Sequence, residues 1–481
     1  MQIRRREFAK TLAAAAVPLQ AQTARRPNIL YIMSDDHAAH AIGAYGSRIN
    51  QTPNIDRIAR EGVRLEKCFC TNSICTPSRA AILTGQYSHI NGVKTLQDPL
   101  DPERQNAAKL LQAGGYSTAV IGKWHLHKDP AGFDYWNILP GQGLYHNPVF
   151  IDMGERKKHS GYATDLITDF SLDWLRRRPK DKPFVLMCHH KAPHRPWQPA
   201  PKYAQLFDDR QIPEPNNLFD DYADRSRAAR DATMRVGEHM NKTDLKTEIP
   251  ADLKGNDLRR WAYQIYMKDY LRCVQSVDDG VGRLLDYLRD QQFEQDTVVI
   301  YTSDQGFFLG DHGWFDKRFM YEESLRMPFL VRYPREIRRA TVNRDLILNI
   351  DFAELFLDYA GLRAPADMQG RSFRANLRGQ TPKDWRQSMY YRYWMHLADH
   401  GVAAHYGVRT HTHKLVYYHG KPLGSSGAVN RETGTEWELF DLKKDPREMR
   451  SVYGDPAYAP VRADLTRELQ RLQQACGDQP A

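Results

Sequence analysis

The stretch Asn28-Ile29-Leu30-Tyr31-Ile32-Met33-Ser34-Asp35-Asp36-His37 joins a short apolar run to a cluster of polar and charged residues. The same design recurs at three other apolar runs, residues 117–121, 184–188 and 297–302, each followed by polar residues. Apolar runs of this length are typical of strands buried on both faces of a parallel sheet. We therefore expect four buried strands that each end in chemically active side chains.

Segments with apolar residues at helical spacing separate these runs. They cover residues 54–62, 106–114 and 258–292. The alternation predicts an α/β fold in which helices sandwich a mostly parallel sheet. Ligands of such sheets bind beyond the carboxyl ends of the strands, so the four polar clusters should converge on one site.

Two later regions differ from this pattern. Residues 205–257 are charged, poor in large apolar side chains and interrupted by three prolines, which indicates a surface excursion over the sheet that could border the site. Beyond about residue 370, the sequence predicts a smaller C-terminal α/β domain on an antiparallel sheet, with strands at 388–393, 404–409, 414–418 and 437–441 and a helix at 458–474. The expected domains are residues 25–370 and 371–481.

The composition of the 481-residue chain, 41% hydrophobic and 26% charged, is that of a globular protein. No apolar run reaches the about 20 residues that cross a bilayer, so no membrane span is expected. The net charge is +9, of which residues 1–24 contribute +3. The remaining +6 forms no basic run with interleaved aromatics, which disfavours nucleic acid as a partner and fits an anionic substrate.

The first 24 residues have the features of a targeting segment. Arg5-Arg6-Glu7-Phe8-Ala9-Lys10 precedes an apolar stretch at 11–19 that is too short to span a bilayer. This order resembles a twin-arginine export signal, which predicts a periplasmic or secreted protein. The alternative is an ordinary basic tail.

The six cysteines include no CxxC pair, so a zinc ribbon is not expected. No GxxxxGK or GxGxxG loop follows a strand, which disfavours nucleotide-dependent chemistry. The sequence leaves open whether five of the cysteines form disulfides or lie in the core: Cys68, Cys70, Cys188, Cys273 and Cys476.

Two of the polar clusters place carboxylates at strand ends. Asp35 and Asp36 are adjacent, and neighbouring carboxylates repel unless a cation or a proton neutralises them. Asp304 and Gln305 add a third carboxylate and an amide oxygen from another strand end. Such hard oxygen ligands suit calcium or magnesium, whereas a helix cap or a solvated turn is the ordinary role of an aspartate after a strand.

The stretch Cys75-Thr76-Pro77-Ser78-Arg79-Ala80-Ala81-Ile82-Leu83-Thr84-Gly85 has proline near its start and glycine at its end, as at helix boundaries. This places Cys75 at a helix N-terminus, where backbone N–H groups favour an anion. The stretch matches the type I sulfatase signature, Cys-x-Pro-Ser-Arg-x-x-x-Leu-Thr-Gly, at every defined position. Further similarity to sulfatases follows, in the usual order, at residues 27–36, 122–125, 191–194, 303–317 and 438–446.

This resemblance implies an alkaline-phosphatase-like fold and hydrolysis of sulfate esters. In the family, a formylglycine-generating maturation enzyme oxidises the signature cysteine, so Cys75 would carry a hydrated aldehyde. One hydroxyl of this diol attacks sulfur and displaces the alcohol, and the second expels sulfate as the aldehyde re-forms. The family usually holds one calcium ion per chain, which implies five ligands here: Asp35, Asp36, Cys75, Asp304 and Gln305. At the position of Gln305 the family commonly has asparagine or histidine. The glutamine side chain has a different length, so the sequence does not decide whether its oxygen coordinates the metal.

The resemblance also implies roles for five other side chains. Arg79 would support the aldehyde hydrate, Lys123 would bind sulfate and His125 would assist deprotonation of the diol. His194 and Lys317 would contact the leaving oxygen, where a proton donor or a cation stabilises developing charge. For three neighbouring residues the sequence does not decide between a structural place in the pocket wall and a functional role: His189, His190 and Lys191.

Residues 303–317 and 436–441 are similar to bacterial N-acetylglucosamine-6-sulfatases. The predicted substrate is therefore a sulfated carbohydrate, specifically 6-O-sulfated N-acetylglucosamine in glycans. The alternatives are another glycan sulfate position, a phosphonate monoester or phosphodiester hydrolase of the same superfamily, and a catalytically silent glycan-binding protein. Three residues of the C-terminal region are either sugar contacts or ordinary polar residues: His396, His405 and Arg409.

Overall fold

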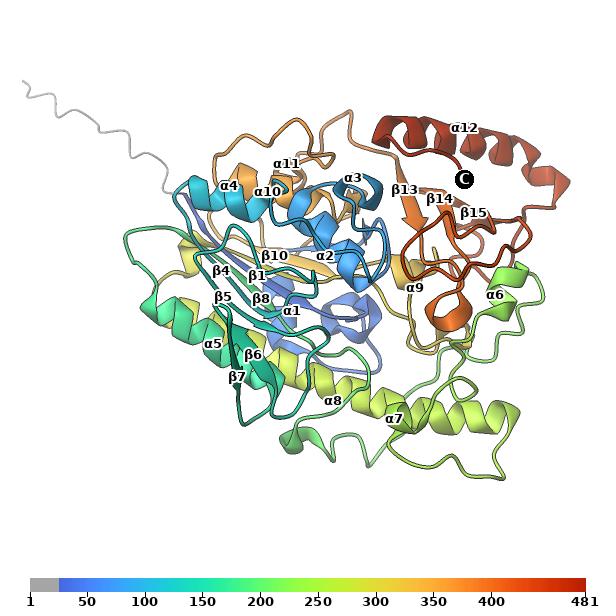
Figure 1. The fold of residues 1–481 in the computed structure, drawn as a ribbon, viewed down its shortest axis with the longest axis horizontal. Helices are drawn as coiled ribbons and strands as arrows, with labels where there is room; N and C mark the ends of the chain where they lie inside the picture. Colours follow the sequence, from blue (N-terminus) through green and yellow to red (C-terminus); the bar gives the residue numbers. More distant parts are fainter. Residues whose placement is uncertain (1–25) are drawn as a thin grey trace, which may run out of the picture.

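The structure, a computed structural model, describes residues 26–481, so the predicted export signal at residues 1–24 lies outside the described residues. A ten-stranded sheet and a four-stranded sheet organise these residues, and helices cover both faces of the larger sheet (Figure 1). A small two-stranded sheet pairs β3 (Cys68–Phe69) with β12 (Ile347–Leu348). Among the described residues, no helix is long and apolar enough to cross a membrane.

The ten-stranded sheet has a parallel centre of five strands: β9 (Thr297–Ser303), β1 (Asn28–Ser34), β8 (Phe184–His189), β4 (Ser117–Lys123) and β5 (Tyr135–Leu139). Each outer strand is antiparallel to its inner neighbour except β11, which runs parallel to β2. The outer strands are β10 (Phe329–Arg332), β2 (Val63–Leu65), β11 (Thr341–Asn343), β6 (Val149–Asp152) and β7 (Glu155–Lys158).

The four strands predicted from apolar runs are β1, β4, β8 and β9, and they lie together at the centre of this sheet. Every residue of β4, β8 and β9 is buried, which explains why their sequences show no alternation of polar and apolar residues. The prediction of a mostly parallel sheet is confirmed.

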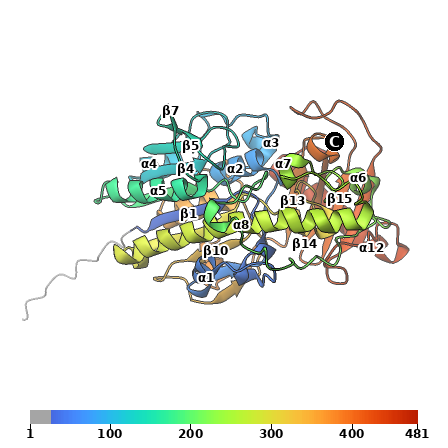
Figure 2. The same cartoon turned by 90° about the horizontal axis from the view of Figure 1, so that it is seen from below.

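Helices form a layer on each face of the large sheet (Figure 1). In one layer α1 (Pro53–Arg60) and α5 (Ala163–Arg177) pack on α8 (Gly255–Asp290), which runs most of the length of the molecule (Figure 2). The other layer consists of α2 (Cys75–Thr84), α4 (Ala107–Ala113) and α10 (Asp351–Tyr359). The three predicted helices correspond to α1, α4 and α8. Shorter helices lie in the connections: α3 (Ser88–Asn91), α9 (Glu322–Leu325) and α11 (Arg374–Leu377).

Local chemistry fixes the ends of two helices in the second layer. The side chain of Asn106 accepts a hydrogen bond from the Lys109 N–H at 3.1 Å and caps α4. α2 ends at Gly85, whose φ of 68° lies in the left-handed region that glycine adopts readily. Cys75 is the first residue of α2, as its signature stretch predicts.

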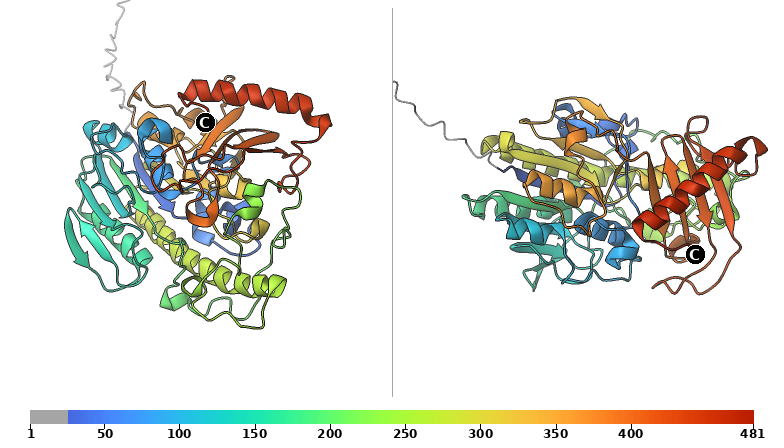
Figure 3. Two further views of the ribbon diagram at one scale, coloured as in Figure 1. Left: turned by 45° about the vertical axis from the view of Figure 1, so that its right-hand side comes forward. Right: turned by 90° about the horizontal axis from the view of Figure 1, so that it is seen from above.

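The C-terminal region forms the predicted antiparallel sheet, with strands β13 (Ser388–Tyr393), β14 (His405–Thr410), β15 (His413–Tyr418) and β16 (Glu436–Asp441). α12 (Ala459–Cys476) lies across it (Figure 3). Glu438 of β16 accepts hydrogen bonds from Tyr418 at 2.9 Å and from Tyr321 at 3.2 Å. Tyr321 belongs to the segment that follows β9, so the small sheet packs against one of the polar clusters.

Residues 205–254 form loops with two short helices, α6 (Arg227–Asp231) and α7 (Lys242–Leu245), and residues 255–257 begin α8. Backbone N–H groups of this segment bond to the small sheet and its approach: Ser226 donates to Glu438 at 2.8 Å, and Thr233 donates to the carbonyl of His400 at 2.7 Å. The predicted surface excursion therefore also links the two sheets.

Candidate active site

The carboxyl ends of the central strands bring the predicted polar clusters together. β1 leads into Asp35 and Asp36, β9 leads into Asp304, and β4 ends at Lys123. This convergence follows from the parallel direction of the strands.

Three buried carboxylates lie at the centre of the site. Asp35, Asp36 and Asp304 are at most 1% exposed, and one ligand oxygen from each lies within 4.8 Å of the others. Tyr270 of α8 holds the turn after β1, because its hydroxyl donates to the Asp36 carbonyl at 2.8 Å and accepts from the Ala38 N–H at 3.0 Å. Carboxylates at this spacing repel, so the cluster depends on nearby positive charge.

Three cationic side chains supply positive charge. Arg79 Nε and Nη2 lie 2.9 and 2.8 Å from Asp304 Oδ2. Lys317 Nζ donates to the two Asp36 oxygens at 2.6 and 2.7 Å. Arg79 also donates to the carbonyl of Lys123 at 2.6 Å, and the ammonium group of Lys123 contacts the remaining carboxylate of the cluster.

The cations compensate the three carboxylates unequally. Burial raises the pKa of Asp36 to about 7 although Lys317 opposes the shift. Burial acts in the same direction on Asp35, but surrounding cations, above all Lys123, hold its pKa well below its usual range. Burial and the neighbouring Asp35 raise the pKa of Asp304. The cations therefore compensate Asp35 more fully than the other two carboxylates.

Cys75 faces this cluster from the N-terminus of α2. Its Sγ lies 3.5 Å from Asp35 Oδ1, and like the other five cysteines it is free and buried. Burial and the charge of Asp35 raise the pKa of the Cys75 thiol to about 12. Reactive cysteines have lowered pKa values, so the unmodified thiol is a weak nucleophile here.

Gln305 lies between the carboxylates and Cys75. Its Nε2 donates to Asp36 Oδ1 at 2.6 Å and lies 4.0 Å from Cys75 Sγ. Its Oε1 is buried and has no hydrogen-bond partner among residues 26–481. Buried oxygens without a hydrogen-bond partner are uncommon, because each has lost its hydrogen bonds to water without replacing them. The amide oxygen of Gln305 is therefore available as a ligand for a cation.

Two predicted histidines lie at the edge of the cluster. His194 Nδ1 is 2.6 Å from the carbonyl of Arg195, which only accepts, so Nδ1 carries a proton. The other nitrogen, Nε2, faces Asp36 Oδ2 at 3.9 Å. Thr76 Oγ1 lies 3.4 Å from His125 Nδ1, which places this imidazole beside the residue that follows Cys75. Burial, reinforced by a neighbouring lysine, lowers the pKa of His125 to about 2.

A pocket of about 290 Å³ lies over Cys75, His194 and Lys317. The sequence assigned no role to the other six polar residues of its wall: Gln142, Arg195, Asp316, Arg318, Asp399 and His400. Arg195 and Arg318 each follow a predicted residue directly, and this adjacency is the only signal that the sequence offered for them. Nothing in the sequence near Asp399 or His400 indicates the site.

Polar contacts connect this wall across distant parts of the chain. His400 Nε2 is 3.1 Å from Asp316 Oδ2 and 3.2 Å from Arg195 Nη1. Arg318 lies 2.7 Å from Asp316 and 3.2 Å from Asp399. The pocket therefore combines charges from the large sheet and from the approach to the small sheet.

The structure brings together all ten residues predicted to hold a metal or to act in catalysis, and their individual roles remain predictions. His189 and His190 are buried behind the site, and the Lys191 ammonium lies 4.7 Å from the ring centroid of Tyr145. The three C-terminal residues considered as sugar contacts do not line the pocket; they are buried within the region of the small sheet: His396, His405 and Arg409.

Comparison with known proteins connects this geometry to a family. A family profile described as "Sulfatase" matches residues 27–362, and one described as "N-sulphoglucosamine sulphohydrolase, C-terminal" matches residues 310–475. The chain is 43% identical over 516 residues to the N-acetylglucosamine-6-O-sulfatase of Bacteroides thetaiotaomicron, covering 98% of this chain and 90% of that protein.

Solved structures extend the comparison to three dimensions. One described as a complex with its substrate, D-glucosamine-2-N,6-O-disulfate, superposes with a TM-score of 0.90 at 42% identity and covers 94% of this chain and 98% of that chain. The phosphonate monoester hydrolase of Silicibacter pomeroyi superposes with a TM-score of 0.71 at 22% identity, covering 93% and 95%. At that identity the likeness shows a shared fold alone.

Proposed function

This chain belongs to the sulfatase family and is a sulfuric ester hydrolase, and we propose that it removes 6-O-sulfate from N-acetylglucosamine in glycans. The observation that carries the proposal is the position of Cys75 at the N-terminus of α2, between three buried carboxylates and a polar pocket. The choice of sugar is supported by 43% identity to a protein named for this activity.

Cys75 would supply the nucleophile after oxidation to formylglycine by a maturation enzyme. The hydrated aldehyde provides one hydroxyl that attacks sulfur and a second that expels sulfate as the aldehyde re-forms. The position supports this role, because Cys75 lies beside Asp35, and Arg79 follows one helical turn later. The guanidinium of Arg79 would hold the hydrate while it compensates Asp304.

A single calcium ion would fit the carboxylate cluster. The buried carboxylates of Asp35, Asp36 and Asp304 are hard oxygen ligands, and the orphaned Oε1 of Gln305 adds a neutral one. Residue 75 would complete the set. Bound calcium would neutralise sulfate oxygens and activate the attacking hydroxyl.

Four side chains around Cys75 would take the remaining roles in catalysis. Lys123 would bind the sulfate group, and His125 would take a proton from the diol. The S–O bond to the sugar breaks as His194 and Lys317 stabilise the charge on the leaving oxygen. The Nδ1 proton of His194 is held by the carbonyl of Arg195, so Nε2 faces the substrate and would donate to the leaving oxygen when it also carries a proton.

The outer wall would recognise the sugar ring. Arg195, Arg318 and Asp399 line the pocket beyond Lys317 and offer charged donors and an acceptor to the ring hydroxyls and the acetamido group. Sites that hydrogen-bond a substrate hydroxyl discriminate strongly against sugars that lack it.

The enzyme would act outside the cytoplasm, in the periplasm or after secretion. The proposal is supported by the order of features in residues 1–24, twin arginines, an apolar stretch and a small residue, which resembles a twin-arginine export signal. This location would give the enzyme access to sulfated glycans outside the cell.

Release of sulfate from a panel of sulfated monosaccharides and oligosaccharides tests the proposal. The chain is co-produced with a formylglycine-generating enzyme, and Cys75→Ala serves as the matched blank. We expect turnover of 6-sulfated N-acetylglucosamine above all other members and none by the blank. Preferred turnover of another sulfated sugar would replace the proposed substrate. Hydrolysis of a phosphonate monoester alone, with the aldehyde verified by mass at residue 75, would replace the proposed reaction.

A further inference from the structure

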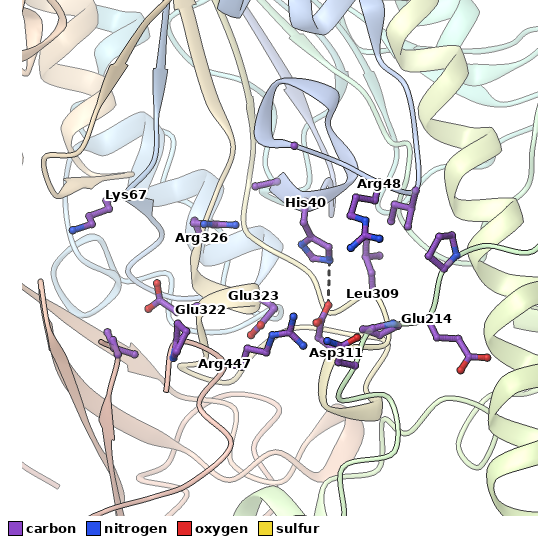
Figure 4. A pocket seen from close by; sticks show the side chains of 18 of the residues that line it. His40, Arg48, Lys67, Glu214, Leu309, Asp311, Glu322, Glu323, Arg326 and Arg447 are labelled. Atoms are coloured by element: carbon purple, nitrogen blue, oxygen red, sulfur yellow. Dashed lines mark ion pairs between the residues drawn. The ribbon is translucent and has the colours of Figure 1, made fainter. Parts of the chain in front are cut away.

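A second cavity lies apart from the catalytic pocket. Its volume is about 690 Å³, within the range of about 300–1,000 Å³ typical of small-ligand sites. Of the described residues, none lines both cavities. The segment after β1, the segment between β9 and β10, and the C-terminal region all contribute to its walls (Figure 4).

Each carboxylate of this cavity lies near a basic side chain. Asp311 Oδ2 lies 3.3 Å from His40 Nε2, the pair marked by the dashed line in Figure 4. Glu322 pairs with Arg409 at 2.9 Å. The remaining two carboxylates pair at 3.6 and 3.5 Å with residues outside the lining: Glu323 with His312 and Glu214 with Arg260.

Four cations of the lining lack such a partner. Within residues 26–481, no carboxylate oxygen lies within 4.0 Å of the charged nitrogens of these side chains: Arg48, Lys67, Arg326 and Arg447. Lys67 Nζ instead lies 2.9 Å from His411 Nδ1. In Figure 4, Arg48 and Arg447 lie on either side of the His40–Asp311 pair. The charges of the cavity that lack an ion-pair partner are therefore predominantly positive.

We propose that this cavity binds an acidic segment of a saccharide chain, carrying sulfate or carboxylate groups, separately from the catalytic pocket. The saccharide part of this assignment rests on the proposed function, whereas the anionic part rests on the unpaired cations. Arginine binds planar and tetrahedral oxyanions through two parallel N–H donors, which suits Arg48, Arg326 and Arg447 to sulfate and carboxylate groups.

The mixture of charges favours a saccharide over a nucleic acid. Single-stranded nucleic acids need aromatic surfaces for stacking, and among the described lining residues Tyr263 is the only phenylalanine, tyrosine or tryptophan. A continuous phosphate backbone would also meet repulsion from Glu214 and Asp311. A sugar ring places hydroxyl donors between its anionic groups, so these same carboxylates would accept hydrogen bonds from it.

Calorimetric binding of a heparin-derived hexasaccharide tests the proposal. The chain carries Cys75→Ala to prevent turnover, and excess 6-sulfated N-acetylglucosamine occupies the catalytic pocket. Arg48→Glu combined with Arg447→Glu changes two exposed cavity residues. Arg338→Glu combined with Arg339→Glu makes the same change of charge at exposed residues outside the cavity. We expect the cavity variant to weaken binding at least about fivefold and the control by less than about twofold.

Three results would overturn the proposal: no binding beyond the catalytic pocket, equal weakening in the two double variants, or tighter binding of a single-stranded DNA of equal charge. Turnover of the sulfated monosaccharide, measured with Cys75 intact, reports separately on the proposed function. Loss of binding with normal turnover would reject the second site alone. Cavity-dependent binding without turnover of any sulfated sugar would reject the proposed function and retain the anion site.

Discussion

At the scale of single residues, the site depends on buried charges that compensate one another. Arg79 contacts Asp304, lies 3.5 Å from Asp35 Oδ2 and donates to the backbone of Lys123. It is 3% exposed, so its removal would leave Asp304 buried with less compensation. Removing one partner of a buried ion pair typically costs about 3–5 kcal/mol.

We therefore expect Arg79→Met to lower the free energy of unfolding by about 3–5 kcal/mol, measured by urea denaturation in EDTA. Added calcium should recover part of the loss, because a ligand that binds only the native state stabilises it. Arg338→Met, at an exposed arginine, should change the value by less than about 0.5 kcal/mol. A loss below about 1 kcal/mol in Arg79→Met would show that other groups compensate Asp304.

The residues that lie together at the candidate catalytic centre could be proposed from the sequence, because the expected chemistry demands fixed types at fixed local spacings. Cys75 and Arg79 lie one turn apart on α2, and Asp35 and Asp36 follow a recognisable buried strand. Gln142 was not predictable, because its place in the pocket wall depends on a contact with Lys123, the last residue of β4. Its own neighbours in the sequence carry no chemical pattern.

At the scale of elements, the central strands were predictable and the edges were not. β1, β4, β8 and β9 are continuous apolar runs because both their faces are buried. β7 is Glu155-Arg156-Lys157-Lys158, a largely exposed edge strand whose pairing with β6 determines its structure. Met153 and Gly154 connect the two strands with φ values of 47° and 94°, without the Asn-Gly signal of short hairpins.

The short helical turn Asp311–Gly313 contains a charge that should make stability depend on pH. His312 is fully buried, 3.1 Å from Asp220 and 3.6 Å from Glu323, with Arg225 also nearby. Burial and Arg225 oppose protonation, but the two carboxylates raise the pKa of His312 to about 9. A raised pKa in the folded state stabilises the protein fully below the unfolded value, and this contribution disappears as the pH rises through the folded value.

We expect the contribution of His312 to unfolding free energy to be complete below pH 6.5 and to be lost by about pH 9, with a change of up to roughly 3 kcal/mol. Urea denaturation across this range should show a slope that His312→Gln reduces. His239→Gln, at a half-buried histidine whose pKa is lowered, should keep the parent slope in this range. Identical slopes for the parent and His312→Gln would show that the imidazole is not held in its charged form.

At the scale of the whole molecule, the catalytic pocket was predictable at its centre and not at its rim. Arg195 meets His400 across 205 positions of sequence, and Arg318 meets Asp399 across 81. Such contacts depend on how the approach to β14 packs against the large sheet. No local pattern encodes that packing, so the sequence could not reveal the residues that form the rim of the pocket.

The rim should therefore control the sugar and leave the reaction itself unchanged. The side chain of Asp399 is 55% exposed at the pocket, so it is free to accept a hydrogen bond from a sugar hydroxyl while it pairs with Arg318. We expect Asp399→Ala to lower kcat/KM for 6-sulfated N-acetylglucosamine by about 10- to 100-fold, equivalent to the loss of about 1.4–2.8 kcal/mol. Hydrolysis of 4-nitrophenyl sulfate, which has no sugar ring, should change by less than about twofold.

Asp384→Ala is the matched control, because this exposed aspartate also pairs with an arginine, at 3.0 Å, but does not line the pocket. It should leave the turnover of both substrates unchanged. Equal losses on the sugar and on 4-nitrophenyl sulfate in Asp399→Ala would place Asp399 in support of the catalytic centre through Arg318. A loss confined to the sugar would mean that residues near the small sheet complete a substrate site whose reaction takes place at the large sheet, so that selectivity depends on both sheets.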